Sequence, residues 1–244
     1  MPLGDFKVLS FSCYGTLINR DSGIYSALRP LLTRGDIGLG REELLAKFSA
    51  YEAQQQAESP RTPYPRVLEE VHRRLAKEWG ILASDDDHAR FGQSTSNWPV
   101  FADAPAALQY LKRFYKLAIL SNADRQTFAS SNLRLDAKFD AIFTGPDIGR
   151  CKPDPGVFEH MAERLAKLGI ERRQILQVSH HLERDQVPAA RCGLAFAWID
   201  RAPVPEIPDE APPSPPPAPA HPHSSGWDYR FVSLVDMVKA HQQR

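Results

Sequence analysis

Short runs of apolar residues recur along the chain between longer segments in which apolar residues return every three or four positions. The runs predict buried strands at residues 6–11, 117–120, 141–143, 175–178 and 195–199. Helical spacing occurs at about 104–115, 155–168 and 185–192. Strands that are separated by helices pair in parallel and are covered on both faces. The pattern therefore predicts an α/β fold, with a parallel sheet in a Rossmann-like three-layer core.

A long segment after the first predicted strand shows only helical spacing. From about residue 22 to residue 92, apolar positions recur at helical intervals in three groups, which begin at Ile24, Leu44 and Val67. No strand-like alternation interrupts them. We therefore predict an all-helical insert at residues 21–96, with residues 1–20 and 97–244 forming the α/β core.

Composition narrows the class of protein. The 244 residues fit one large domain with an insert, and 30 basic against 30 acidic residues leave no net charge for broad binding to nucleic acid or an anionic membrane. No apolar run approaches the roughly 18 residues of a membrane span, and the N-terminus lacks the pattern of a secretory signal. Cys13, Cys151 and Cys192 lack the spacing of a disulfide framework or a metal site. We expect a cytoplasmic protein.

Proline is concentrated in one late segment. Ten of the 21 prolines lie between Pro203 and Pro222. Proline donates no backbone hydrogen bond and favours extended polyproline conformations. We therefore predict an exposed, semi-stiff surface loop at residues 203–226, with the following residues completing the same core.

Polar residues gather directly after the predicted strands. In open parallel sheets the ligand lies beyond the carboxyl ends of the strands, so chemistry is expected there. The residues of interest at these ends are Ser12, Tyr14, Thr16, Ser121, Asn122, Lys152, His180, His181 and Asp185.

Four of these segments carry recognisable motifs. They are residues 11–17 (Phe-Ser-Cys-Tyr-Gly-Thr-Leu), 120–122 (Leu-Ser-Asn), 152–155 (Lys-Pro-Asp-Pro) and 178–185 (Val-Ser-His-His-Leu-Glu-Arg-Asp). In order and spacing the chain resembles the haloacid dehalogenase superfamily, in its L-2-haloacid dehalogenase-type branch. The resemblance implies that the helical insert at 21–96 is a cap over the active site, and that Trp98 lies where the chain returns from it. We call this insert the cap.

The sequence departs from the family pattern where the chemistry is concentrated. Ser12 occupies the position of the family's nucleophilic aspartate, Tyr14 that of the second acid of the phosphatases, and His180 that of the leading acid of the fourth motif. Magnesium prefers carboxylate oxygens, and a serine hydroxyl needs a base before it attacks. We therefore predict no metal site, no cofactor, and neither a magnesium-dependent phosphatase nor an ordinary dehalogenase.

The surviving polar residues define the candidate site. The predicted catalytic residues are Ser12, Lys152, His180, His181 and Asp185. The predicted substrate-binding residues are Tyr14, Thr16, Trp98, Ser121 and Asn122. A histidine that reaches Ser12 would activate its hydroxyl, and histidine suits acid–base catalysis near neutrality. Adjacent side chains in extended chain point to opposite sides, so one histidine of the pair is expected to face the site. A purely structural Lys152–Asp185 ion pair is the alternative for those two residues.

Three functions stay open at this point. The first is a metal-independent enzyme that uses acid–base catalysis for hydrolysis, isomerisation, dehydration or cyclisation of a small organic acid or carbonyl compound. The second is a catalytically dead protein of the same fold that binds a small molecule or regulates a partner. The third is an inactive form of a 2-haloacid dehalogenase. A small molecule is the expected partner, with no nucleic acid and no membrane, and a homodimer stays open.

Overall fold

One parallel sheet forms the centre of the computed structural model, which describes residues 2–201 and 227–243. Its strands are β1 (Val8–Phe11), β2 (Lys116–Ser121), β3 (Ala141–Thr144), β4 (Ile175–Ser179), β5 (Ala195–Ile199) and β6 (Tyr229–Phe231). Their order in the sheet is β3-β2-β1-β4-β5-β6, and every neighbouring pair is parallel. The predicted parallel sheet is confirmed, and β6 is an additional short edge strand.

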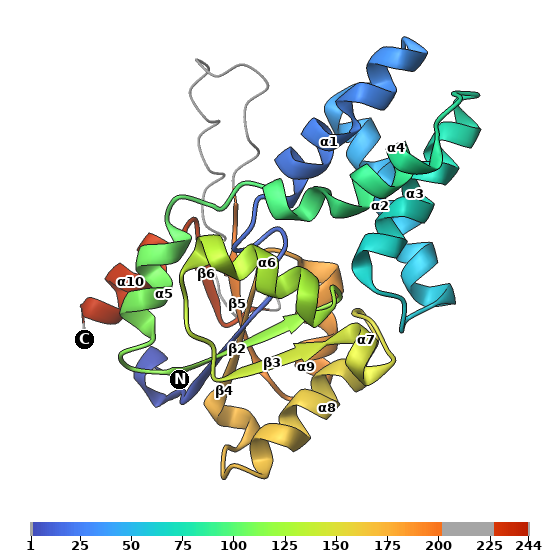
Figure 1. Ribbon diagram of the computed structural model, residues 1–244. Helices are drawn as coiled ribbons and strands as arrows, with labels where there is room; N and C mark the ends of the chain where they lie inside the picture. Colours follow the sequence, from blue (N-terminus) through green and yellow to red (C-terminus); the bar gives the residue numbers. More distant parts are fainter. Residues whose placement is uncertain (1, 202–226, 244) are drawn as a thin grey trace.

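Helices cover both faces of the sheet, as Figure 1 shows. α5 (Ala104–Leu111), α6 (Arg125–Leu135) and α10 (Leu234–Gln242) pack on one face, and α8 (Pro155–Ala166) and α9 (Val187–Arg191) pack on the other. The short helix α7 (Gly145–Ile148) follows β3. Successive residues of β1 alternate between the two layers, since Leu9 and Phe11 join the first core and Val8 joins the second. The predicted three-layer α/β core is confirmed.

Two core helices differ from the sequence expectation. The helix predicted at 185–192 consists of a π-helical turn (Leu182–Gln186) followed by α9. α6 was not predicted, because few apolar residues mark its buried face. Its start is set locally instead, by the Asp124 side chain, which accepts a hydrogen bond from the Thr127 backbone N–H.

The helices of the cap are α1 (Arg20–Gly35), α2 (Arg41–Glu58), α3 (Tyr64–Glu78) and α4 (Asp85–Gly92), followed by a 3₁₀ turn (Gln93–Asn97). From here on the cap therefore denotes residues 20–97, one residue more at each end than the segment named from the sequence. In Figure 1 these helices stand together beside one end of the sheet. Side-chain caps fix two of their starts: Asn19 accepts from Ser22, and Ser84 forms a capping box with Asp87. The chain leaves and re-enters the core at one place, where Ile18 bridges to Val100.

The last part of the core lies beyond the proline-rich segment. The surface loop predicted at 203–226 falls outside the described residues. β5 and β6, which flank it in sequence, are neighbours in the sheet, so residues 227–243 complete the same core. Within residues 2–201 and 227–243, no helix combines the length and apolar character that crossing a membrane requires.

Candidate active site

A small polar cavity lies at the carboxyl ends of β1, β2 and β4, beneath the cap. Six predicted site residues line it: Ser12, Tyr14, Ser121, Asn122, Lys152 and His181. Five further polar residues complete the wall, four from the cap and one from the core: Arg20, Glu52, Gln56, Tyr64 and Arg184. The cavity volume is about 20 Å³, whereas holding one water needs about 10–15 Å³. We call this space the inner cavity.

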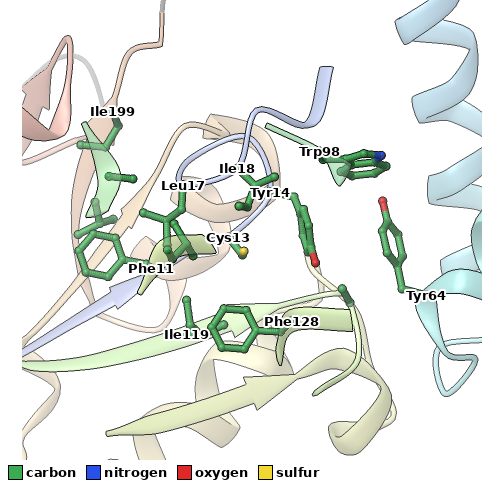
Figure 2. Close-up of a cluster of buried hydrophobic side chains, with 14 of the residues drawn as sticks. Phe11, Cys13, Tyr14, Leu17, Ile18, Tyr64, Trp98, Ile119, Phe128 and Ile199 are labelled. Atoms are coloured by element: carbon green, nitrogen blue, oxygen red, sulfur yellow. The ribbon is translucent and has the colours of Figure 1, made fainter. Parts of the chain in front are cut away.

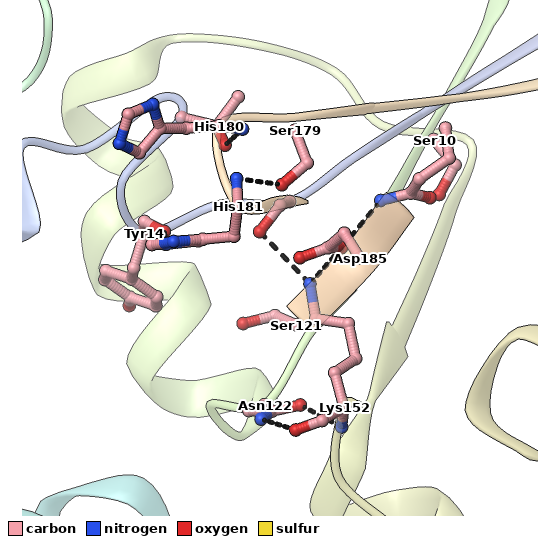
Figure 3. A network of polar contacts seen from close by, with 12 residues as sticks. Ser10, Tyr14, Ser121, Asn122, Lys152, Ser179, His180, His181 and Asp185 are labelled. Atoms are coloured by element: carbon pink, nitrogen blue, oxygen red, sulfur yellow. Dashed lines mark hydrogen bonds and ion pairs between the residues drawn. The ribbon is translucent and has the colours of Figure 1, made fainter. Parts of the chain in front are cut away.

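Lys152 is the centre of the polar network in Figure 3. Its Nζ donates hydrogen bonds to Ser12 Oγ at 3.1 Å and to Asp185 Oδ1 at 2.7 Å. All three side chains are buried. Burial lowers the pKa of Lys152, and the neighbouring Asp185 carboxylate opposes that shift. The amine therefore bridges a hydroxyl and a carboxylate in a dry environment.

Asn122 holds the backbone of Lys152 in place. Its Oδ1 accepts from the Lys152 backbone N–H at 2.7 Å, and its Nδ2 donates to the Lys152 carbonyl at 3.0 Å. Asp185 is positioned separately, because Gln177 Nε2 donates to its Oδ1 at 3.0 Å. The second carboxylate oxygen of Asp185 is buried without a hydrogen-bond partner. Lys152 is therefore the one cation that compensates the Asp185 charge within the described residues.

His181 faces the inner cavity in its neutral form. Its Nε2 lies 3.2 Å from the Tyr14 carbonyl oxygen, and a carbonyl only accepts, so Nε2 carries the proton. Burial is the main cause that lowers the pKa of His181 well below its ordinary value, and the Arg184 charge adds to it. A histidine with so low a pKa is a weak base. No hydrogen bond joins Ser12 to either histidine within the described residues, so the predicted Ser–His pair is not formed.

Four predicted site residues do not line the inner cavity. Asp185 is one of them and is linked to the cavity through its contact with Lys152; the others are Thr16, Trp98 and His180. The His180 ring turns away from Lys152 in Figure 3, and its Nδ1 lies 3.1 Å from the Ile199 carbonyl oxygen. Thr16 is buried beneath it and accepts from the His180 backbone N–H at 3.0 Å. Trp98 packs edge-on against Tyr14 and Tyr64, as Figure 2 shows, and supports that wall from behind. These side chains hold the site without facing it.

Glu52 is the most constrained residue that the sequence analysis missed. Its carboxylate accepts from Arg20 Nη2 at 2.7 Å, from Arg184 Nη2 at 3.3 Å, and from the Tyr64 hydroxyl. Burial opposes its ionisation, but Arg20 and Arg184 outweigh burial and lower the pKa of Glu52 to about 2. A signal existed in the sequence. Glu52 and Gln56 continue at spacings of four the buried stripe that Leu44 and Phe48 begin on α2.

The donor set of this site does not fit a magnesium ion. Within the described residues, no group of three or more His, Cys, Asp or Glu side chains is placed to hold a metal. The cavity presents Ser12, Tyr14 and His181 where hard carboxylate ligands would be needed, and the Lys152 amine lies against Ser12. Two buried carboxylates of the described residues lie at or beside the cavity, and both are already engaged. Asp185 is bound by Lys152 and by Gln177. Glu52 is bound by Arg20, Arg184 and Tyr64. We derive no step through a metal.

Gly15 sets the position of His181. Its φ is +90°, and a Cβ at this position would lie 2.5 Å from His181 Nε2. We expect Gly15→Ala to lower the free energy of unfolding by about 2–4 kcal/mol, from left-handed backbone strain plus steric overlap. Gly193→Ala is the matched control, because its φ is +70° and nothing lies within 4 Å. Urea unfolding of both variants measures the difference. Equal losses would show that His181 is not held by this contact.

Comparisons with known proteins agree with this fold. Residues 6–191 match the family model described as haloacid dehalogenase-like hydrolase. N-acylneuraminate-9-phosphatase from Rattus norvegicus is 31% identical over 103 residues, which are 41% of this chain and 40% of that protein. The matched region thus spans less than half the length of this curated relative.

Solved structures of dehalogenases share the whole architecture. The L-2-haloacid dehalogenase PA0810 superposes with a TM-score of 0.75 at 20% identity, covering 98% of this chain and 100% of that one. The L-2-haloacid dehalogenase from Xanthobacter autotrophicus with chloropropionic acid covalently bound gives a TM-score of 0.72 at 19% identity, covering 97% and 98%. At such identities the likeness establishes the fold alone.

Proposed function

Because the chain belongs to the haloacid dehalogenase-like hydrolase family, we propose that it is a metal-independent hydrolase that cleaves acyl derivatives of small organic acids at Ser12. In this proposal Ser12 serves as nucleophile in place of the aspartate that the family resemblance implies. The observation that carries the proposal is the position of Lys152 Nζ, 3.1 Å from Ser12 Oγ and 2.7 Å from Asp185 Oδ1. A buried amine beside a hydroxyl is the arrangement of serine–lysine catalysis.

The chemistry balances with these groups alone. The ammonium of the Lys152–Asp185 pair first loses a proton to water, which the lowered pKa of the buried Lys152 favours. The neutral amine then accepts the Ser12 Oγ proton while Oγ forms a bond to the substrate carbonyl carbon. The resulting ammonium returns that proton to the leaving alcohol as its carbon–oxygen bond breaks. A water molecule then attacks the acyl-serine in the same way, giving the free acid and restoring Ser12. Asp185 orients the amine throughout and stabilises the ammonium form.

Lys152 is a better proton acceptor here than His181. The pKa of His181 lies well below its ordinary value, so its ring takes up a proton poorly. Its Nε2 proton is also engaged with the Tyr14 carbonyl. We therefore assign the base role to Lys152, and we assign to His181 the shaping of the cavity wall. Ser121 and Asn122 border the space that the substrate enters.

Hydrolysis is expected to be independent of divalent cations. The substrates for the test are p-nitrophenyl acetate and monomethyl succinate, assayed by released nitrophenol and by titration of released acid. We expect rates with EDTA and with added magnesium to agree within about twofold, because the part of the chain that the structure describes has no group of three or more His, Cys, Asp or Glu side chains placed to hold a cation. A large gain with magnesium, or activity confined to phosphate esters, would contradict the proposal.

One observation favours a second function. The inner cavity, at about 20 Å³, holds no organic molecule in the conformation described here. A protein of this fold that had lost turnover would tolerate such filling, and would then act as a binding or regulatory protein. Absence of hydrolysis over a broad panel of small esters, together with unchanged ligand binding in a Ser12→Ala variant, would favour this second function.

A further inference from the structure

A second cavity adjoins the inner one. It has a volume of about 350 Å³ and lies between the second half of α2 and the core segment 149–154. Gln56, Lys152 and Arg184 line both cavities, so they form the partition between them. We call this second space the outer groove. Its size is within the range of small-molecule sites, which begins at about 300 Å³.

The partition is closed by two hydrogen bonds between the cap and the core. Arg184 Nη2 donates to Glu52 Oε2 at 3.3 Å, and Asn122 Nδ2 donates to Gln56 Oε1 at 2.9 Å. Because the inner cavity holds about one water, a substrate reaches Ser12 only after some contact between cap and core has opened. The partition separates Ser12 from a groove that is large enough for a small molecule. The two hydrogen bonds named above close this partition.

The charged residues at the partition favour an anionic ligand. Lys152 pairs with Asp185, and Arg20 pairs with Glu52 at 2.7 Å, each within the buried interior. Arg184 shares the Glu52 carboxylate at the longer distance of 3.3 Å, and its side chain is 24% exposed. Arg20 also pairs with Asp21 at 3.2 Å. Among the described residues, the one carboxylate paired with Arg184 is Glu52, and Arg184 shares it with the closer Arg20. A planar guanidinium in this position suits a carboxylate ligand.

We propose that the outer groove is the entry site for the substrate, and that Arg184 binds the substrate's carboxylate there. When Arg184 exchanges Glu52 for this carboxylate, the cap–core partition loses one of its two hydrogen bonds, and the acyl group can pass to Ser12. The proposal rests on the proposed function for the nature of the substrate, a small acid that keeps one free carboxylate beside the bond to be cleaved. Arg184 is thus a specificity-determining residue.

Binding measurements without turnover test this proposal. The full chain is titrated calorimetrically with three ligands. Succinate is the carboxylate probe, inorganic phosphate is an anion of different chemistry, and succinamide is the neutral analogue of succinate. We expect the wild type to bind succinate more tightly than phosphate and to bind succinamide at least tenfold more weakly. Arg184→Gln should weaken succinate binding at least tenfold, and Arg184→Lys should retain part of the affinity because it keeps the charge.

Arg173→Gln is the matched control. Arg173 lines neither cavity, and its guanidinium lies 2.7 Å from the Glu171 carboxylate. We expect this variant to change succinate affinity less than threefold. Thermal melts should show both glutamine variants folded, because Arg184 is partly exposed and Arg173 is exposed.

Several outcomes overturn the proposal: no succinate binding by the wild type, unchanged affinity in Arg184→Gln, an equal loss in Arg173→Gln, or tighter binding of phosphate than of succinate. Failure of the proposed hydrolase is distinguishable from these. Arg184-dependent succinate binding without any hydrolysis would reject the serine chemistry and support the entry site. Hydrolysis together with succinate binding that does not depend on Arg184 would support the serine chemistry and reject the entry site.

Discussion

Replacing Lys152 by methionine is expected to lower the free energy of unfolding by about 3–5 kcal/mol, because it leaves a buried carboxylate without its cation. Asp185 is fully buried, and after the substitution the neutral Gln177 amide is the one side chain of the described residues that still donates to it. Solvent cannot reach the carboxylate to replace the lost ammonium. The same variant is expected to abolish hydrolysis, since it removes the proposed base. Urea unfolding followed by circular dichroism measures the stability, and ester assays measure the activity.

Two controls separate the buried ion pair from ion pairs in general. Lys112→Met removes the cation of the Lys112–Asp140 pair, whose side chains are each 32% exposed, so a loss of about 1 kcal/mol or less is expected. The double variant Lys152→Met with Asp185→Asn removes both charges and keeps an acceptor for Gln177. It should recover most of the lost stability without recovering activity. If Lys152→Met is as stable as the wild type, the pair does not hold the two loops together.

The strand ends were the part of the site that sequence reasoning could locate. Each buried run is short and apolar, and a parallel sheet brings its carboxyl ends to one edge, so Ser12, Asn122, Lys152 and Asp185 were expected to meet. They do, through hydrogen bonds that centre on Lys152. The Lys152–Asp185 pair by itself would tie two loops together, and the contact of the same amine with Ser12 is the observation from which the proposed base role is argued.

The direction of a side chain after a strand could not be predicted. His180 and His181 are adjacent and chemically identical, and their roles separate only because Gly15 leaves room for His181 while the Ile199 carbonyl takes the His180 ring. Trp98 was expected to line the substrate space, yet it is bound behind Tyr14 and Tyr64. These outcomes depend on contacts between elements far apart in sequence, which periodicity does not encode.

The helices of the cap were predicted from the sequence, but the polar residues that they contribute to the site were not. Helical spacing identifies the helices, but it does not tell which of their polar residues will meet the core. Glu52 is buried because Arg20, Tyr64 and Arg184 converge on it from three elements. A buried carboxylate needs such partners, and each of them lies on a different part of the chain. From the sequence alone, Arg184 in particular cannot be distinguished from an ordinary charged residue of a turn.

Replacing Ser12 by alanine is expected to lower the hydrolytic rate by about three orders of magnitude or more, as loss of an activated nucleophile does. Stability should change little, because Lys152 keeps its bond to Asp185 and only one hydrogen bond is lost. Ser10→Ala is the matched control. Ser10 is also buried and lies on β1, two residues before Ser12, but its hydroxyl donates to Met161 Sδ in the second core, away from the cavity. Its activity should equal that of the wild type.

The pH profile and an aspartate variant complete this test. Lys152 accepts a proton only as the neutral amine, so the wild-type rate should rise with pH and level off below the ordinary pKa of lysine, because burial lowers the Lys152 pKa. Ser12→Asp should lack esterase activity, since the new carboxylate raises the pKa of the neighbouring Lys152 and keeps it protonated. Release of chloride from 2-chloropropionate by Ser12→Asp, with no hydrolysis by the wild type, would instead identify an inactive dehalogenase. An unchanged rate in Ser12→Ala would remove Ser12 from the reaction and leave the acid–base groups around Lys152 as the remaining basis for catalysis.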